Sequence, residues 1–468
     1  MGDIRYVSLS DTHFGADNSI LTRLSKVDGP VDPQHPSDLL IHLVNCLRNV
    51  INANEGHAKP RLILNGDILD LAFSTENVAA MAFRNFLELT MPQDPAAQLF
   101  DPNFIFIPGN HDHHLWEICR ERRFVDQMRA TDWSQPWDKP RHITELRDPE
   151  PLTSHFLEAV ARSLPWLGDV RVETVYPNLG FLKGDRLVIY THGHFIENVY
   201  LMASQIADLL YPKTPPPATM EEWEAQNFAW IDFVWSVLGR SGRIGPDEEA
   251  VYNTANSPKA LGVLLGSAVK TLIMSKTGSS SKGIADGIEQ LVAAIIEEVF
   301  ERSSHQSVLS DDGAGLKRFL AIPIQQQIRS DYPDLTAEAD ITVVFGHTHK
   351  PFQARMDIDG FLTSQIDAFN SGGWVVDSPD IEPLIGGAVI LMDEDLNIAS
   401  LRMYNEAPER SDYTVSVRAI TDNNPLRDRL SGLINPTVWP WSDFSASANA
   451  TVKMHNKRLK LFLKPQGD

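Results

Sequence analysis

Cysteine is scarce in this chain, which has only Cys46 and Cys119 among its 468 residues. Two cysteines cannot supply the disulfide framework of small secreted scaffolds, and so low a count is typical of a reducing compartment. Both cysteines fall in segments that we expect to be helical. With 43% hydrophobic and 22% charged residues, the composition is that of a globular protein stabilised by a hydrophobic core.

Long apolar runs and an N-terminal leader are also missing. No uninterrupted apolar stretch reaches the ~18 residues that a membrane-spanning helix needs. Met1 leads almost directly into the first predicted strand, which leaves no room for a signal peptide. The opening MGDIRY lacks the Ser or Thr that myristoylation favours at the sixth position. These features predict a cytoplasmic protein.

Positive charge is outnumbered by negative charge. The chain has 41 Lys and Arg against 62 Asp and Glu, a formal net charge of −21. Such a chain repels polyanions and shows no sustained basic stripe, so nucleic acid is disfavoured as a substrate, although bound cations could supply local positive charge. The locally basic residues 453–464 alternate with leucines. They predict an amphipathic edge strand guarded by lysines, with a binding arm as the alternative.

Five short hydrophobic runs, in contrast, each end in a cluster of polar residues. The runs are residues 4–9, 61–64, 104–108, 186–190 and 341–345, and they are followed by SDTH (10–13), NGDILD (65–70), GNHD (109–112), THGH (191–194) and GHTH (346–349). Runs rich in β-branched and aromatic residues predict buried strands. Because ligands gather at the carboxyl ends of strands, we expect the five clusters to meet at the end of one sheet.

The clusters contain seven side chains of metal-ligand type: Asp11, His13, Asp67, Asn110, His192, His347 and His349. This mixture of carboxylate, amide and imidazole donors without thiolate suits Mn, Fe, Zn, Co or Ni better than Mg or Ca. Seven donors exceed the needs of one tetrahedral ion, but they fill two sites if a carboxylate bridges ions roughly 3.5 to 4 Å apart. Asp67, central in the order, is the natural bridge.

Each cluster taken alone has a simpler interpretation. Asp11 and His13 after a strand are more often turn or cap residues than ligands, and Asn110 alone would be an ordinary turn residue. It is the succession of five clusters that favours a dinuclear metal centre. Asp112 is either part of the site or the cap of a helix predicted over residues 115–128. Three further histidines are either pocket residues or partners behind the ligands, or else solvated or core-packed side chains: His113, His114 and His194.

In this order the clusters resemble the calcineurin-like metallophosphoesterase superfamily, with its succession of DxH, GDxxD, GNHD/E, HG(H/D) and GHxH. The resemblance covers the chain from Ile4 to about Met403, with the segment of residues 197–340 outside it. It implies an α/β fold, a two-sheet β-sandwich flanked by helices in four layers. The sequence Asn-Ser-Gly-Gly-Trp at 370–374 resembles the turn that returns the superfamily chain into its second sheet, and residues 388–392 and 398–404 predict a hairpin.

The resemblance also implies roles for these residues. One metal would be held by Asp11, His13 and His349 and the other by Asn110, His192 and His347, with Asp67 bridging. His111 would donate a hydrogen bond to a phosphoryl oxygen or protonate the leaving alkoxide, while Asp70 orients its ring. A metal-bound hydroxide would attack phosphorus in line with the leaving oxygen, without a covalent phosphoenzyme.

The domain organisation follows from the spacing of the clusters. We expect a core of residues 1–196 and 341–404, a mainly helical insertion at 197–340 that acts as a cap, and a C-terminal extension at 405–468 packed on the core. Helical spacing in the insertion predicts helices at 199–211, 221–238, 258–275 and 284–302. The last two are strongly apolar and resemble the inserted helices of the superfamily branch that hydrolyses lipid-linked pyrophosphates. Mutual packing or a dimer interface is the alternative, and neither helix has the cationic face of a membrane-surface helix.

Three functions remain open at this level. The first is a metal-dependent hydrolase of a phosphate ester, phosphodiester or pyrophosphate that uses two divalent metal ions, Mn, Fe or Zn. The second is a nuclease of the same chemistry, which would need a basic groove. The third is a non-catalytic scaffold with the same fold, which would be marked by lost ligands, and none is lost here. The expected partner is a phosphorylated small molecule or a lipid-linked substrate; contact with a membrane surface and oligomerisation through the insertion stay open.

Overall fold

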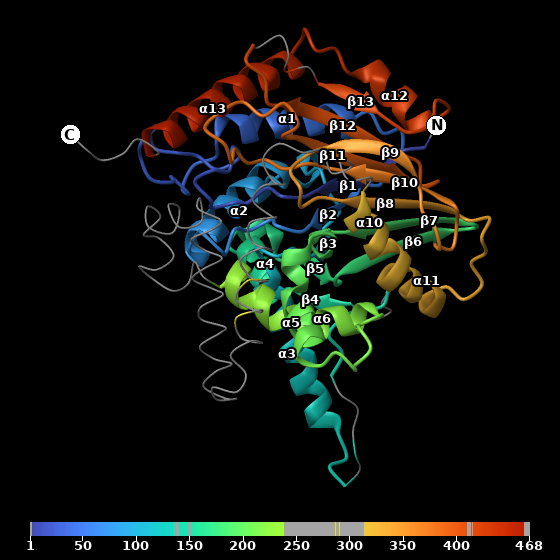
Figure 1. Cartoon of the computed structure of the whole chain (residues 1–468). Coiled ribbons are helices and arrows are strands. Elements are labelled where there is room, and N and C mark those ends of the chain that lie inside the picture. Colours follow the sequence, from blue (N-terminus) through green and yellow to red (C-terminus); the bar gives the residue numbers. More distant parts are fainter. Residues whose placement is uncertain are drawn as a thin grey trace.

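The computed structural model describes residues 2–134, 136, 140–147, 151–237, 286, 290, 313–409, 413 and 415–462. Two β-sheets lie face to face and helices cover their outer faces, so the protein is a four-layer α/β sandwich (Figure 1). This confirms the predicted fold class. In the described residues, no helix is at once long and apolar enough to cross a membrane.

The larger sheet has eight strands with a parallel centre. Its strands, in spatial order, are β13 (Ser416–Arg418), β12 (Ile398–Asn405), β11 (Gly386–Asp393), β1 (Ile4–Leu9), β2 (Arg61–Asn65), β3 (Asn103–Ile107), β5 (Arg171–Thr174) and β4 (Leu152–Thr153). The strands β1, β2, β3 and β5 pair in parallel, and β11 joins β1 in antiparallel register. The hairpin β11–β12 confirms the prediction for residues 388–404.

The smaller sheet has five strands. In spatial order they are β6 (Asn178–Lys183), β7 (Arg186–Thr191), β8 (Asp340–Phe345), β10 (Gln365–Asn370) and β9 (Phe352–Asp357). The strands that precede the polar clusters are thus divided, with β1, β2 and β3 in the larger sheet and β7 and β8 in the smaller one. The prediction that all five lie in one sheet is wrong, because the chain passes from the first sheet to the second between β5 and β6.

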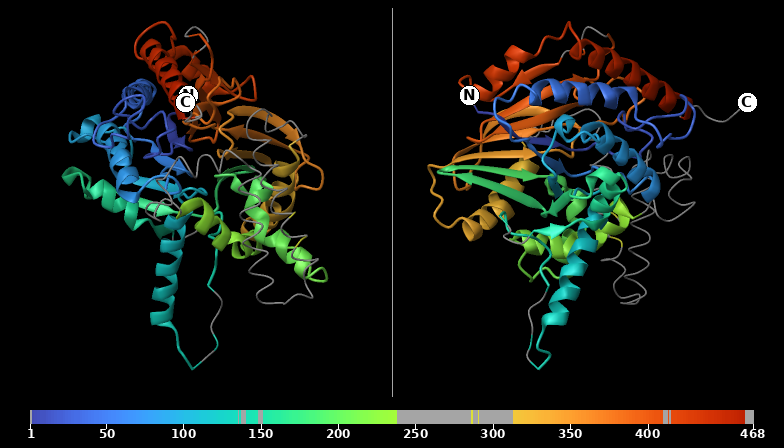
Figure 2. Two further views of the ribbon diagram at one scale, coloured as in Figure 1. Left: turned by 60° about the vertical axis from the view of Figure 1, so that its left-hand side comes forward. Right: turned by 180° about the vertical axis from the view of Figure 1, so that it is seen from behind.

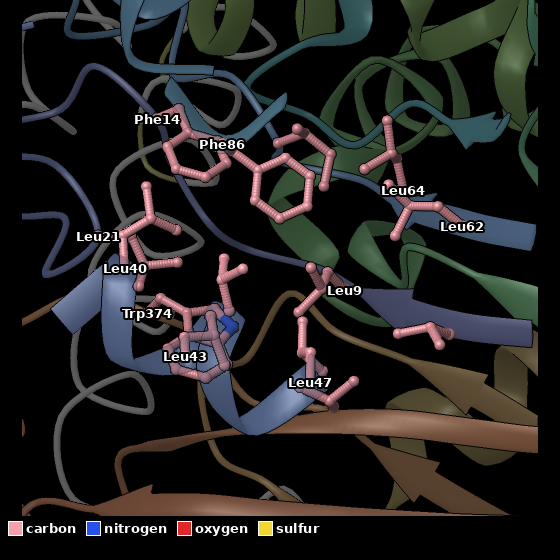
Figure 3. Packing of buried hydrophobic residues seen from close by; sticks show 14 of the residues in the cluster. Leu9, Phe14, Leu21, Leu40, Leu43, Leu47, Leu62, Leu64, Phe86 and Trp374 are labelled. Carbon is pink, nitrogen blue, oxygen red and sulfur yellow. The ribbon is translucent and has the colours of Figure 1, made fainter. Parts of the chain in front are cut away.

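Alternation along the strands builds the three apolar layers. On β2, Leu62 and Leu64 face the outer helices, whereas Ile63 faces the other sheet. Figure 3 shows Leu9 beside Leu47 of α1 (Asp38–Ile51) and Leu64 on the side of Phe86, in one buried cluster. The strands β1 and β2 are therefore held from both faces, which leaves only their carboxyl ends to present polar side chains.

The helices over the larger sheet come from both ends of the chain. They are α1, α2 (Glu76–Thr90), α4 (His155–Arg162), α12 (Pro425–Leu433) and α13 (Trp441–Phe462), while α3 (His113–Ala130) extends away from the body of the molecule (Figures 1 and 2). Cys46 is buried in α1 and Cys119 in α3, as expected.

The C-terminal extension packs on the core, with α13 lying along α1 (Figure 1). The predicted edge strand at residues 453–464 is wrong, since α13 continues to Phe462. Phe444, Ala448 and Val452 are buried at a spacing of four residues, which is the period of a helix. The alternation of leucines did not determine the structure, because Leu461 is exposed.

The described parts of the insertion are helical and cover the smaller sheet. They comprise α5 (Met202–Leu210), α6 (Met220–Ile231), the π-helical turn η5 (Asp232–Ser236), α10 (Ala314–Phe319) and α11 (Gln325–Asp331). Trp223 and Phe319 pack in one cluster with Val343 and Phe345 of β8. The helices predicted at 199–211 and 221–238 are thus present with shifted ends, whereas those at 258–275 and 284–302 lie outside the described residues, apart from Asp286 and Gln290.

Candidate dinuclear metal centre

The loops that follow β1, β2, β3, β7 and β8 converge between the carboxyl ends of the two sheets. Backbone hydrogen bonds join them directly, from Asp11 N to Gly66 O at 2.9 Å and from Gly346 N to His192 O at 2.9 Å. The turn at 370–374 leads from β10 to β11 and adds a bond from Trp374 N to Asp11 O at 2.9 Å. The five clusters of the sequence therefore form one site, shared by the two sheets.

The structure brings all seven predicted donors together in two groups. Asp11, His13 and His349 form one group and Asp67, His192 and His347 form the other, with ligand-type atoms within 4.8 Å of one another. Asp67 lies between them, its Oδ2 3.7 Å from His13 Nε2 and 3.2 Å from His192 Nε2.

Asn110 joins the second group. Its Oδ1 lies 3.1 Å from His192 Nε2, and both side chains are buried. The seven predicted donors thus lie close together with Asp67 in contact with both groups, and their division between two metals stays a prediction.

Backbone strain is concentrated at the same residues. Six non-glycine residues in the described chain have a positive φ, and five of them belong to the site: Asp11, His13, Asp67, His347 and His349. Each such conformation costs of order 1 kcal/mol and persists only where the surroundings impose it. The fold holds these side chains in place against their local preference, as expected for a site whose geometry serves a ligand.

The four histidines of the site share a second feature: one ring nitrogen faces the site and the other faces an oxygen outside it. The outer contacts are His13 Nδ1 with Asp70 Oδ2 (3.0 Å), His349 Nδ1 with Asp377 Oδ2 (2.9 Å), His192 Nδ1 with Asn65 O (3.2 Å) and His347 Nε2 with Glu197 Oε2 (3.3 Å). The contacts of His13, His349 and His192 are hydrogen bonds, and such partners fix the tautomer and the orientation of metal-binding histidines.

Two of these partners, Asp377 and Glu197, were not predicted from the sequence. Each follows a recognised cluster at a distance for which no spacing rule exists: Asp377 lies after the Gly-Gly-Trp turn and Glu197 after the THGH cluster. The only signal in the sequence was an acidic residue soon after a motif, which is too common to be used.

His111 and Asp70 lie close together, and Asp70 has a second histidine beside it. Its Oδ2 lies 3.2 Å from His111 Nδ1, without hydrogen-bond geometry, and 3.0 Å from His13 Nδ1, so one buried carboxylate faces two rings. Burial opposes a charge on His111, but Asp70 and Asp67 raise its pKa to about 9. His111 N donates to Asp67 Oδ1 at 2.8 Å, which fixes the backbone that carries the ring.

Asp112 is neither a ligand nor a helix cap. It occupies the N-cap position of α3, but its side chain makes no capping bond. Instead its carboxylate accepts hydrogen bonds from Gly109 N at 2.7 Å and Ile68 N at 2.8 Å. The interpretation as a cap is wrong, because these amides belong to the loops after β2 and β3, which Asp112 holds together.

The three further histidines lie outside the two groups of donors. His113 is fully buried against Glu224 of α6, with 2.8 Å between Nε2 and Oε1. His194 is buried with its Nε2 3.2 Å from the Tyr176 hydroxyl, and His114 pairs with Asp232 at 3.1 Å. Of the alternatives left open for His113 and His194, core packing is the one observed.

The model of the calcineurin-like phosphoesterase family matches residues 4–250, more than half of the chain. The chain belongs to the calcineurin-like phosphoesterase family. The matched residues include the first four clusters. The fifth, GHTH at 346–349, lies outside them in the sequence but next to them in the folded chain. No curated protein matches the chain.

The donor set of this phosphoesterase fits divalent cations. His13 Nε2 and both ring nitrogens of His347 are buried and have no hydrogen-bond partner among the described residues. Burial opposes the charge on Asp67, yet His192, His111 and His13 hold its pKa well below the usual range, so it is ionised in the interior. Buried carboxylates beside unpaired imidazole nitrogens are satisfied by a divalent cation.

Proposed function

We propose that the chain hydrolyses a phosphate ester, phosphodiester or pyrophosphate with the help of two divalent metal ions. The observation that carries the proposal is the completeness of the site: seven donors in two groups around Asp67, with His111 beside them and its ring directed by Asp70. A family member that kept only the fold would have no reason to retain strained ligands and their outer partners. We take Mn, Fe or Zn as the metals.

The roles follow from position. Asp11, His13 and His349 would hold one cation, and Asn110, His192 and His347 the other, with Asp67 shared. Cations there would supply Lewis-acid activation of water and of the phosphoryl group.

His111 lies next to Asp67 at the margin of the donor groups, and its side chain is 13% exposed. The ring therefore reaches solvent while its Nδ1 faces Asp70, and in the charged form its Nε2 can donate a proton to a phosphoryl or leaving-group oxygen. Asp70, together with Asp67, stabilises this charged form.

The other functions have less support. A nuclease needs a basic groove, and the described surroundings of the site include the carboxylates of Glu197 and Asp377. A small phosphorylated molecule or a lipid-linked phosphate remains the proposed substrate, bound beneath the insertion. The cysteines are unpaired and buried, in keeping with the cytoplasmic location that we propose from the sequence.

The test combines metal analysis with turnover. We expect about two metals per chain after loading with Mn, and turnover of p-nitrophenyl phosphate or bis-p-nitrophenyl phosphate. His111→Ala should lower turnover by about 10²- to 10⁴-fold, the usual worth of general acid catalysis, with the metal content intact. His35→Ala, a substitution at an exposed histidine paired with Asp32, is the matched control and should change neither.

Two results would count against the proposal. A chain that takes up no metal after loading would overturn the assignment of the seven donors. Unchanged turnover in the His111→Ala variant would remove the role assigned to that residue, while leaving the metal centre in place.

A further inference from the structure

The insertion touches the loop that carries His111. Ser236, the last residue of η5, is fully buried against it. Its Oγ accepts a hydrogen bond from His114 N at 2.8 Å and donates one to His111 O at 3.3 Å. A single hydroxyl of the insertion thus bridges both ends of the turn that begins at the proposed general acid.

Two carboxylates of the same segment hold the side chains that follow His111. Asp232 of η5 lies 3.1 Å from His114 Nδ1 and 3.5 Å from His113 Nδ1. Glu224 of α6 lies 2.8 Å from His113 Nε2 and accepts a hydrogen bond from the Tyr176 hydroxyl at 2.9 Å. The segment α6–η5 is therefore bound to this loop by buried polar contacts.

One part of this network has the composition of a metal site. His113, Glu117 and Glu224 offer ligand-type atoms within 4.8 Å of one another, all buried. Their charges, however, are already compensated, since Glu117 pairs with Arg120 at 2.6 Å and Glu224 pairs with His113. The cluster is accordingly a set of ion pairs that binds the insertion to α3.

The core holds the same loop on one side, at His111 and through the Asp112 carboxylate, which accepts from Gly109 N and Ile68 N. His111 N donates to Asp67 Oδ1, and His111 O accepts from Leu71 N at 3.2 Å. The ring of His111 must also keep its contact with Asp70, which depends on the direction of the backbone between His111 and His114. The insertion supplies the hydrogen bonds on this second side, through Ser236.

We infer that Ser236 is a positioning residue for His111, and that the segment α6–η5 is thereby part of the catalytic architecture. The inference rests on the proposed function. None of the five sequence clusters contains these insertion residues. Without the hydroxyl, His114 N and one acceptor site of His111 O lose their partner, and the turn can shift. A displacement of about 1 Å in a reacting group can cost up to 10²-fold in rate.

The decisive comparison is Ser236→Ala with Ser204→Ala. Ser204 is also a buried serine of the insertion, but its Oγ bonds Asn227 Nδ2 at 2.7 Å within the insertion. Both variants lose a buried hydroxyl, and only the first loses contact with the loop of His111. We expect kcat to fall about 10-fold or more for Ser236→Ala and less than about 2-fold for Ser204→Ala, with KM and metal content near wild-type values.

The leaving group separates positioning from general damage. A phenyl ester has a more basic leaving group than the p-nitrophenyl ester and depends more on the acid, so the loss for Ser236→Ala should be greater with the phenyl ester. In a His111→Ala background, Ser236→Ala should cause no further fall in kcat, because the two residues act through one ring.

Equal losses on both esters, or effects that add fully in the double variant, would overturn the inference. So would a kcat for Ser236→Ala equal to that of Ser204→Ala in an active enzyme, and the proposed function would then stand. A wild-type chain loaded with metal but without turnover on any phosphate ester would overturn the proposed function and the inference together. Urea unfolding of both variants verifies that each is folded under the assay conditions.

Discussion

Asp70→Asn should affect two histidines at once. Asp70 is 1% exposed, its Oδ1 accepts from Phe73 N at 2.8 Å, and its Oδ2 faces His13 Nδ1 at 3.0 Å and His111 Nδ1 at 3.2 Å. Asparagine has the same shape but only one acceptor. If its oxygen keeps the bond to Phe73 N, its amide group faces both rings as a donor.

The size of the effect follows from that geometry. Opposed by a donor, each ring must place its proton on Nε2, the nitrogen that faces the site, and can no longer present a lone pair there. Loss of such an outer partner usually costs about 10- to 100-fold in metal affinity, which is about 1.4 to 2.7 kcal/mol for the group of Asp11, His13 and His349. The second consequence is a misdirected His111, which lowers kcat even when metal is bound.

Asp377→Asn is the matched control. Asp377 contacts His349 Nδ1 at 2.9 Å, and His349 belongs to the same group of donors as His13. In the described part of the chain, Asp377 makes no hydrogen bond or ion pair with His111. Both variants should need more Mn for half-maximal activity, as measured by Mn titration of turnover and by calorimetry of Mn binding. At saturating Mn, Asp377→Asn should regain nearly all of the wild-type kcat, whereas Asp70→Asn should remain at least about 10-fold lower.

Full recovery of both variants at saturating Mn would refute the effect on His111, because Asp70 would then act only through His13. An unchanged affinity for Mn in both variants would refute the effect on the donors, since the outer contacts would then have no influence on them.

Three further predictions follow. Gly66 has φ +84°, and a Cβ there would lie 2.3 Å from His192 Nδ1, so Gly66→Ala should lose Mn binding at the second group. Gly184 has φ +63° but open space around it, so Gly184→Ala should lose only about 1 kcal/mol of stability in urea unfolding. Burial, aided by Asp377 and Glu382, raises the pKa of Glu406 from 4.5 to about 8, so the folded chain keeps this proton while the unfolded chain releases it. The stability that this protonated carboxyl contributes is therefore present below pH 4.5 and is lost as the pH rises toward about 8, at up to about 1.4 kcal/mol per pH unit. Glu406→Gln should be more stable than the wild type at pH 8.5 but not at pH 4.5, with both proteins measured in chelator. Free Mn at 100 times its dissociation constant should raise the free energy of unfolding by about 2.7 kcal/mol per site over the chelated protein, and an unchanged unfolding midpoint would contradict binding to the folded site.

Much of the site could be predicted because its residues follow strands directly. Asp11, Asp67 and Asn110 each come within a few residues of a buried strand, and the end of a strand fixes where the next side chains lie. The succession of clusters indicated that they share one site, and the family resemblance supplied the proposed division of the donors between two metals. The same local reasoning failed at residues 453–464, where alternating leucines indicated a strand although packing against α1 favours a helix.

The sequence by itself indicated the seven candidate donors, the strands that precede them and the α/β class, since each depends on residues that are close along the chain. Only the tertiary structure decided that the strands belong to two sheets. It also decided that Asp377 contacts His349 and that Glu197 contacts His347. The hydrogen bond from Ser236 of the insertion to the loop of His111 is a third such feature. These contacts join residues that are 28 to 150 positions apart in the sequence, and none of the new partners lies at a fixed spacing from a motif. Their positions are set by how the sheets and helices pack, and no local pattern of residues encodes that.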